Sequence, residues 1–173
     1  MTDYSTLLFV VAPALLVALS SYMIIKKMLE GEANRKGAEL IMETRKITIP
    51  MRLQAYERLV LMLDRISPES LIIRVRKNDM TNQDLQLALL SAIRAEFEHN
   101  LSQQLYVSME TWEAVKAAKE SIVSMINEVA MKVKPEEPSI VMARMVLERT
   151  ASSDMEYLAD AMQRLKSEAR KIF

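Results

Sequence analysis

The sequence contains no cysteine, two glycines and one histidine among 173 residues. Without cysteine, the chain cannot form disulfides, thiolate metal sites or a cysteine nucleophile. Gly31 and Gly37 cannot form a phosphate-binding loop or a dinucleotide fingerprint, because both motifs need clustered glycines. Aromatic residues make up 5% of the chain, and no basic stripe has aromatic residues interleaved with it. The sequence therefore gives no indication of nucleic-acid binding.

The residues that are abundant favour helix from end to end. Leu, Met, Ala, Glu, Lys, Arg and Gln dominate, and there are few prolines. We predict an all-α protein with a single N-terminal transmembrane helix followed by a cytoplasmic helical bundle. The expected parts are a transmembrane anchor (1–25), a charged juxtamembrane stalk (26–49), a bundle core (50–134) and a C-terminal helical segment (135–173).

The membrane prediction rests on the stretch Tyr4–Ile25, which has no Asp, Glu, Lys, Arg or His. As a helix it would span about 33 Å, close to the roughly 30 Å hydrocarbon core of a bilayer. Pro13 is tolerated in a membrane helix when neighbouring groups satisfy the freed carbonyl, so we expect a mild kink there.

Charge predicts the orientation of this span. Lys26, Lys27, Arg35 and Lys36 follow it and no Lys or Arg precedes it, which places the N-terminus outside and the body in the cytoplasm of a bacterial cell. The alternative is a cleaved secretory signal, for which Ala18 and Ser20 supply small residues. A positively charged leader is missing and the apolar run is long for a signal, so we favour the anchor.

The remaining charge is distributed unevenly. The part from residue 26 to 77 holds twelve Lys or Arg against seven acids, whereas residues 78–173 hold eleven against fifteen. Because anionic lipids attract Lys and Arg, this gradient suits a body lying next to the inner leaflet. Membrane lipid is therefore an expected partner.

Capping signals divide the body into helices. A boundary is expected before Pro50, since the residue preceding a proline avoids the helical region. Ser67, Thr81 and Ser108 are expected N-caps, with Asp84 completing a capping box. The expected segments are 50–66, 68–75 (helix or strand), 81–106, 109–134 and 139–173, the last in two parts with a break near 151–153 and a second capping box from Ser153 and Glu156.

Apolar spacing predicts which faces are buried. Each expected helix repeats large apolar residues at intervals of three or four. The inward residues expected are Tyr56, Leu59, Val60, Leu63 and Ile66; Leu85, Leu89, Ile93, Phe97, Leu101 and Leu105; Trp112, Val115, Ile122, Ile126, Val129 and Val133; and Met155, Leu158, Met162 and Leu165.

One local pattern could carry chemistry. Glu96 and His99 have the three-residue spacing used by carboxylate-bridged di-iron bundles, but those bundles need the pair twice, and His99 is the single histidine. A metal site could return at an oligomer axis, which leaves a metal-dependent enzyme as a remote alternative. A hydrolase would have to pair His99 with Ser91 or Ser102, neither of which lies on a sharp glycine-flanked turn. We therefore predict no catalytic, cofactor-binding or metal-binding residue.

The amide side chains of Asn100, Gln103 and Gln104, which follow this pair, have a different interpretation. Amide side chains on a Leu-rich helix can bond across a helix interface and fix its register, or they can lie on a solvated face. The fourteen methionines mostly suit core packing, with Met142, Met145, Met155 and Met162 as candidates to meet a partner. The residues proposed for interaction or packing specificity are Glu96, His99, Asn100, Gln103, Gln104, Tyr106 and Trp112.

Three stretches resemble a known family: LQAYERL at Leu53–Leu59, ISP at Ile66–Pro68 and EFEHNLSQQLY at Glu96–Tyr106. Over about Arg45 to Trp112, the chain is similar to an uncharacterised family of small, single-pass, helical membrane proteins from Bacteroidota. The resemblance implies an inner-membrane location and no activity.

The expected function is that of a non-enzymatic, membrane-anchored structural or assembly subunit of an inner-membrane complex. Its partners would be other membrane or cytoplasmic subunits, contacted through helix faces. The alternative is a membrane-surface scaffold or adaptor that self-associates and recruits a soluble client through its C-terminal helix. An enzyme is disfavoured because polar groups do not converge.

Overall fold

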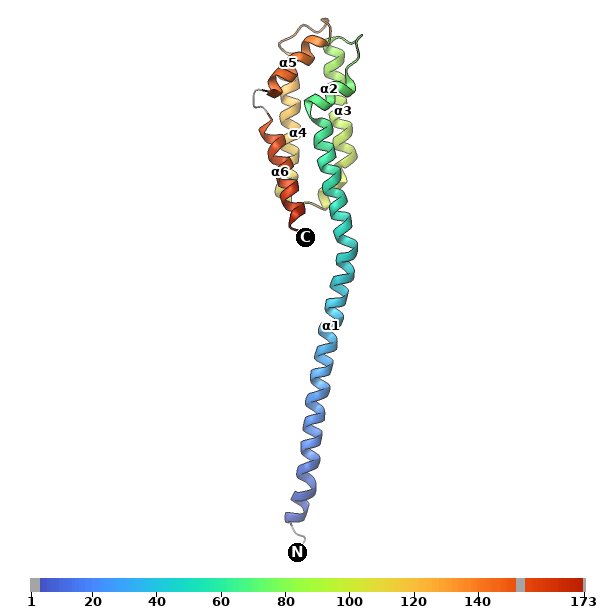
Figure 1. Ribbon diagram of the computed structural model, residues 1–173, viewed down its shortest axis with the longest axis vertical. Helices are drawn as coiled ribbons and strands as arrows, with labels where there is room; N and C mark the ends of the chain where they lie inside the picture. Colours follow the sequence, from blue (N-terminus) through green and yellow to red (C-terminus); the bar gives the residue numbers. More distant parts are fainter. Residues whose placement is uncertain (1–3, 152–154, 173) are drawn as a thin grey trace. The chain divides into compact units, whose positions relative to one another are not determined.

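The computed structural model describes residues 4–151 and 155–172, apart from the side chains of some residues in the first 41. Every named element within those ranges is a helix, which confirms the all-α prediction (Figure 1). The elements in chain order are α1 (Tyr4–Ile66), α2 (Pro68–Val75), α3 (Asn82–Asn100), the 3₁₀ helix η1 (Leu101–Leu105), α4 (Met109–Ala130), α5 (Ile140–Ala151) and α6 (Glu156–Arg170).

The chain divides into two compact units, Met1–Thr48 and Ile49–Phe173. The first unit contains the N-terminal part of α1. Its described large apolar side chains between Leu15 and Leu29 are all exposed. Over the residues that the structure describes, no helix offers a stretch both long and apolar enough to cross a bilayer. The predicted span includes the side chains of residues 4–12, which lie outside the described part.

Helix α1 corrects one predicted boundary. No helix begins at Pro50, because α1 continues through this residue to Ile66. A proline inside a helix removes one backbone hydrogen bond and leaves the carbonyl of the residue four positions earlier without its donor. Here that residue is Lys46, which is exposed, as is Pro50 itself, so water can bond to the freed carbonyl.

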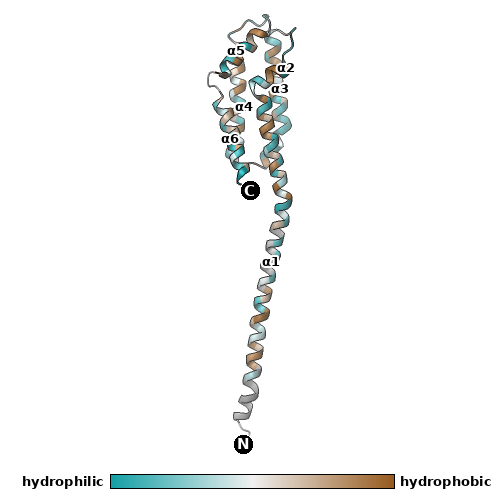
Figure 2. Cartoon of the chain, viewed as in Figure 1, coloured by the Kyte–Doolittle hydropathy of each residue, from teal (hydrophilic) through white to brown (hydrophobic). Residues whose placement is uncertain are grey.

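The second unit buries a single apolar cluster to which α1, α2, α3, α4, α5 and α6 all contribute. Hydrophobic residues recur along these helices (Figure 2). Helices α4 and α6 lie side by side, and α4 also contacts α3 and α5 (Figure 1). The predicted α1 face is buried at Tyr56, Leu59, Leu63 and Ile66, so that prediction is confirmed at these positions.

Short capping sequences fix the helix starts. The Ser67 side chain accepts from the backbone N–H of Ser70, and residues 68–75 form a helix rather than a strand. Thr81 and Asp84 form the predicted capping box of α3, and the Ser108 side chain caps α4. Of the second predicted capping box, Ser153 lies outside the described residues. Helix α6 begins at Glu156 with Met155 as its N-cap and without a side-chain capping bond, so the predicted start of this helix is wrong.

The C-terminal end of α3 departs from the predicted pattern. The α-helix stops at Asn100 and continues as the 3₁₀ helix η1, in which side chains repeat every three residues rather than every 3.6. The apolar residues that follow Leu85, Leu89 and Ile93 in η1 therefore no longer fall on the buried face of α3. Leu101 is 44% exposed and Leu105 is 80% exposed, so the prediction that both point inward is wrong.

The connector between α4 and α5 is held by Asn82, a buried residue at the start of α3. Its backbone N–H donates to the carbonyl of Glu137 at 2.8 Å, and its side-chain amide donates to the carbonyl of Lys134 at 2.8 Å. Its side-chain oxygen accepts from the N–H of Met142. Helix α4 ends at Ala130, earlier than the predicted Lys134.

Candidate functional site

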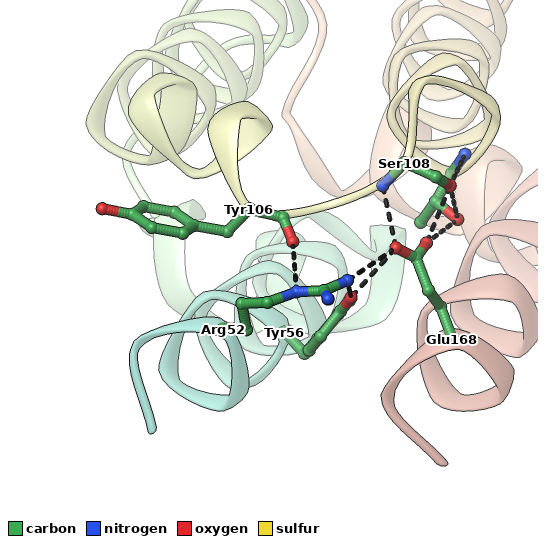
Figure 3. Close-up of polar contacts among 6 residues, drawn as sticks. Arg52, Tyr56, Tyr106, Ser108 and Glu168 are labelled. Carbon is green, nitrogen blue, oxygen red and sulfur yellow. Dashed lines mark hydrogen bonds and ion pairs between the residues drawn. The ribbon is translucent and has the colours of Figure 1, made fainter. Parts of the chain in front are cut away.

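A cluster of polar side chains in the second unit surrounds Glu168 (Figure 3). We call it the Glu168 cluster. It joins α1, the connector between η1 and α4, the first turn of α4, and α6. Its members are Arg52, Tyr56, Tyr106, Ser108, Thr111 and Glu168.

The carboxylate of Glu168 accepts hydrogen bonds from three residues. The Tyr56 hydroxyl donates to Oε1 at 2.9 Å, and the Ser108 backbone N–H donates to the same oxygen at 2.8 Å. The hydroxyls of Ser108 and Thr111 lie within hydrogen-bonding distance of Oε2. Both carboxylate oxygens are therefore occupied by protein donors.

Local structure brings these donors together. Ser108 is the N-cap of α4, so its hydroxyl and backbone amide lie at the positive end of that helix. Unpaired N–H groups and the helix dipole both favour a negative charge at this position. Glu168, in the last turn of α6, supplies that charge from a residue sixty positions away. The carboxylate thus ties the C-terminal end of α6 to the N-terminal end of α4.

Arg52 links the same carboxylate to α1. Its guanidinium donates to the Tyr56 hydroxyl at 2.8 Å and to the Tyr106 carbonyl at 3.2 Å. It also lies 3.6 Å from Glu168 Oε1, forming an ion pair. The Tyr56 hydroxyl therefore accepts from Arg52 and donates to Glu168, which leaves it no free proton.

Two opposing influences act on the pKa of Glu168. Burial raises the pKa, but hydrogen bonds from the side chains of Thr111, Ser108 and Tyr56 and from the Ser108 backbone lower it by more, so the net shift is downward. The pKa of Tyr56 is raised by burial and by its bond to Glu168, with Arg52 opposing. At neutral pH the carboxylate is ionised and the phenol is protonated. In this state the carboxylate holds α1, α4 and α6 together through its hydrogen bonds.

The predicted pair of Glu96 and His99 is divided between different surroundings. Glu96 Oε1 accepts from Arg65 at 2.8 Å and lies 3.6 Å from Arg74. His99 is exposed. Within the described part of the chain, no group of three or more His, Asp or Glu side chains is placed to hold a metal ion. The carboxylate of Glu96 instead links α3 to the ends of α1 and α2.

The amides predicted to fix packing bond close to their own positions. The Asn100 side chain is buried and donates to the carbonyl of Glu96 one turn earlier. Gln103 is buried, and its side-chain amide donates to the Ser102 hydroxyl at 3.4 Å. Gln104 is exposed. These bonds end α3 locally rather than crossing to another helix.

An amide pair that does cross between helices was not predicted. Gln86 of α3 donates to Asn127 of α4 at 2.9 Å. Trp112 packs where predicted: it is buried and stacks on Phe97 with ring centroids 5.4 Å apart. Tyr106 contributes its backbone carbonyl to the Glu168 cluster.

Of the methionines proposed to meet a partner, Met142 is fully buried. Met145 and Met162 are partly buried and pack against the core. Met155 precedes α6 and is also partly buried. For Met142, Met145 and Met162 the alternative of core packing is the one confirmed.

The second unit is a helical bundle in which hydrogen bonds to the Glu168 carboxylate join α1, α4 and α6. The chain belongs to DUF7935, a family of unknown function, whose model matches residues 2–172. No curated protein and no solved structure matches it.

Proposed function

We propose that this protein is a non-enzymatic, membrane-anchored structural or assembly subunit of a bacterial inner-membrane complex. Residues 4–25 would form the anchor, and the bundle would present helix faces to other membrane or cytoplasmic subunits. The inner-membrane location and the origin in Bacteroidota that the sequence resemblance implies are part of the same proposal. The observation that carries it is the exposure of the described large apolar side chains of α1 between Leu15 and Leu29, which lie on every side of the helix.

The distribution of these side chains favours lipid over a partner helix. The large apolar residues from Leu15 to Leu29 are 58% to 70% exposed, and they include the consecutive runs Leu15–Val17 and Tyr22–Ile25. Successive residues of an α-helix are separated by about 100° around its axis, so such runs place apolar groups on every side. A partner helix would cover the apolar residues on one face of α1 only, whereas a bilayer surrounds the segment on all sides.

The chain supports this location with positive charge as well. Lys26 and Lys27 follow the apolar run and are exposed. Cations that flank a span remain on the cytoplasmic side and are attracted to anionic lipid headgroups. The bundle would accordingly lie in the cytoplasm.

Labelling of introduced cysteines tests both anchoring and orientation, because the natural chain has none. Thr2→Cys and Glu136→Cys would each be expressed alone and treated with a membrane-impermeant maleimide on intact spheroplasts. We expect Thr2→Cys to be labelled from outside and Glu136→Cys to be labelled after lysis alone. Labelling of both, or of neither, on intact spheroplasts would overturn the proposed topology.

Crosslinking in native membranes tests the assembly function. Adducts with other subunits in a fixed ratio would support it. Adducts between copies of this chain alone would favour the second class, a self-associating scaffold that recruits a soluble client. The described contacts give no specific support to an enzyme, since Glu96 and Glu168 are both engaged in structural bonds.

A further inference from the structure

A groove between α2 and α5 lies outside every contact described above. Its volume is about 450 Å³, and its exposed lining is almost entirely apolar. Ile72, Ile140, Ala143 and Leu147 form its apolar walls, with Arg76 and Arg144 at its edges. The two helices are in direct contact with each other.

The spacing of residues along α5 suits a helical occupant. Ile140 and Leu147 are seven residues apart and exposed by 46% and 40%, while the small Ala143 lies between them on the same face. This is the repeat by which one helix packs along another. Across the groove, Ile72 of α2 supplies the facing apolar wall. An amphipathic helix with large apolar residues at matching intervals would cover both Ile140 and Leu147.

The charges on the edges specify the occupant further. Arg144 is exposed, and within the described part of the chain it forms neither an ion pair nor a side-chain hydrogen bond. The guanidinium of Arg76 bonds to the neutral Asn78. Glu148 also lines the groove but already has a partner. Two cations without carboxylate partners beside an apolar surface are complementary to a helix with acidic flanks.

We propose that the groove between α2 and α5 binds an acidic amphipathic helix of another protein. This inference gives the proposed assembly function a defined surface and rests on that function. The apolar face of the occupant would lie on Ile140 and Leu147, and its carboxylates would pair with Arg76 and Arg144.

Two synthetic peptides test the proposal against the purified full chain in neutral detergent. Both are 18-residue helices with Leu at positions i, i+3 and i+7, and they differ in carrying Glu or Lys at the flanking positions. Binding is measured by fluorescence anisotropy, with detergent alone as the baseline. We expect the Glu peptide to bind about tenfold more tightly than the Lys peptide, because it gains attraction where the other is repelled.

Matched variants separate groove binding from general charge attraction. The double variant Arg76→Glu with Arg144→Glu should reverse the preference. The control Arg58→Glu with Lys132→Glu, which changes the same net charge at exposed positions elsewhere, should keep it. Leu147→Asp should weaken binding of the Glu peptide at least about tenfold. Leu87→Asp, at an exposed position of α3, should leave this binding unchanged. Circular dichroism melting establishes that each variant is folded.

Three results would overturn the proposal. These are equal binding of both peptides, no binding of either, and a shift from oligomer to monomer in Leu147→Asp, which would make the groove an interface between copies of this chain. The assay is independent of the membrane, so its failure leaves the labelling experiment unaffected. A failure of labelling would likewise leave the peptide result standing.

Discussion

At the residue scale, Glu168 makes more long-range contacts than any other carboxylate described. It bonds to groups that are 57, 60 and 112 positions away in sequence. A carboxylate that accepts several hydrogen bonds is well placed only while all of its donors remain in position. Glu168 therefore couples the second-unit part of α1 to the N-terminal end of α4 and the C-terminal end of α6.

Replacing Glu168 with alanine should destabilise the second unit by about 2–4 kcal/mol. The change removes charge-assisted bonds, each contributing about 1.5–3 kcal/mol and not fully additive, and leaves the Ser108 N–H and the Thr111 hydroxyl without their acceptor. Urea unfolding followed by circular dichroism measures the loss. Glu57→Ala is the control, since Glu57 is an exposed carboxylate of α1, next to Tyr56 in the sequence. Equal effects of the two changes would contradict the assigned contacts.

Acid should remove the contribution of Glu168 selectively. Its pKa in the folded protein lies below the ordinary value of 4.5. Its contribution is therefore complete above about pH 4.5 and is lost as the pH falls through the folded-state pKa. The difference in unfolding free energy between the natural chain and Glu168→Gln should be largest at neutral pH and should shrink by pH 3. A difference that stays constant from pH 7 to pH 3 would show that ionisation of Glu168 is not involved.

At the element scale, sequence signals placed the helix starts more reliably than the helix ends. Ser67, Thr81 and Ser108 cap helices because each needs nothing beyond donors two or three residues away. The predicted helix boundary at Pro50 and the predicted burial of Leu105 are wrong for a different reason. Whether a proline interrupts a helix, and whether a stripe stays in register through a 3₁₀ turn, depends on solvent and packing around the segment.

The Glu168 cluster shows where prediction from sequence stops. Ser108 was predicted as a cap, but nothing near Glu168 indicates that its carboxylate belongs to that cap. The contact exists because α6 packs along α4. The hydrogen bond between Gln86 and Asn127 could not be predicted for the same reason. An amide pair across two helices can be predicted only when the register between those helices is known.

The buried side of α5 provides a stability prediction at this scale. Met142 is fully buried, whereas Met131, just beyond α4, is 80% exposed. Met142→Ala should cost about 2–4 kcal/mol of unfolding free energy, since it removes buried methylene groups and leaves a cavity. Met131→Ala should change it by less than about 0.5 kcal/mol. Thermal or urea unfolding of both variants makes the comparison, and a similar loss in each would contradict the described burial.

At the scale of the whole molecule, the chain combines two units with opposite relations to apolar surface. The second unit buries its large apolar residues in one cluster. The first unit leaves exposed the large apolar residues of α1 that the structure describes there. In water such a segment would be costly, at about 25 cal/mol for each Å² of apolar area. The central claim of the proposal is that lipid covers this segment.

Alkaline carbonate extraction of membranes from cells producing the full chain tests that claim most directly. Leu16→Arg with Leu19→Arg places two charges inside the apolar run at a cost of about 3 kcal/mol each. Met42→Arg with Ile47→Arg makes the same change at exposed apolar positions of α1 beyond that run. We predict that the natural chain and the second variant stay in the membrane pellet while the first variant is released. Release of the natural chain into the supernatant would contradict the anchor.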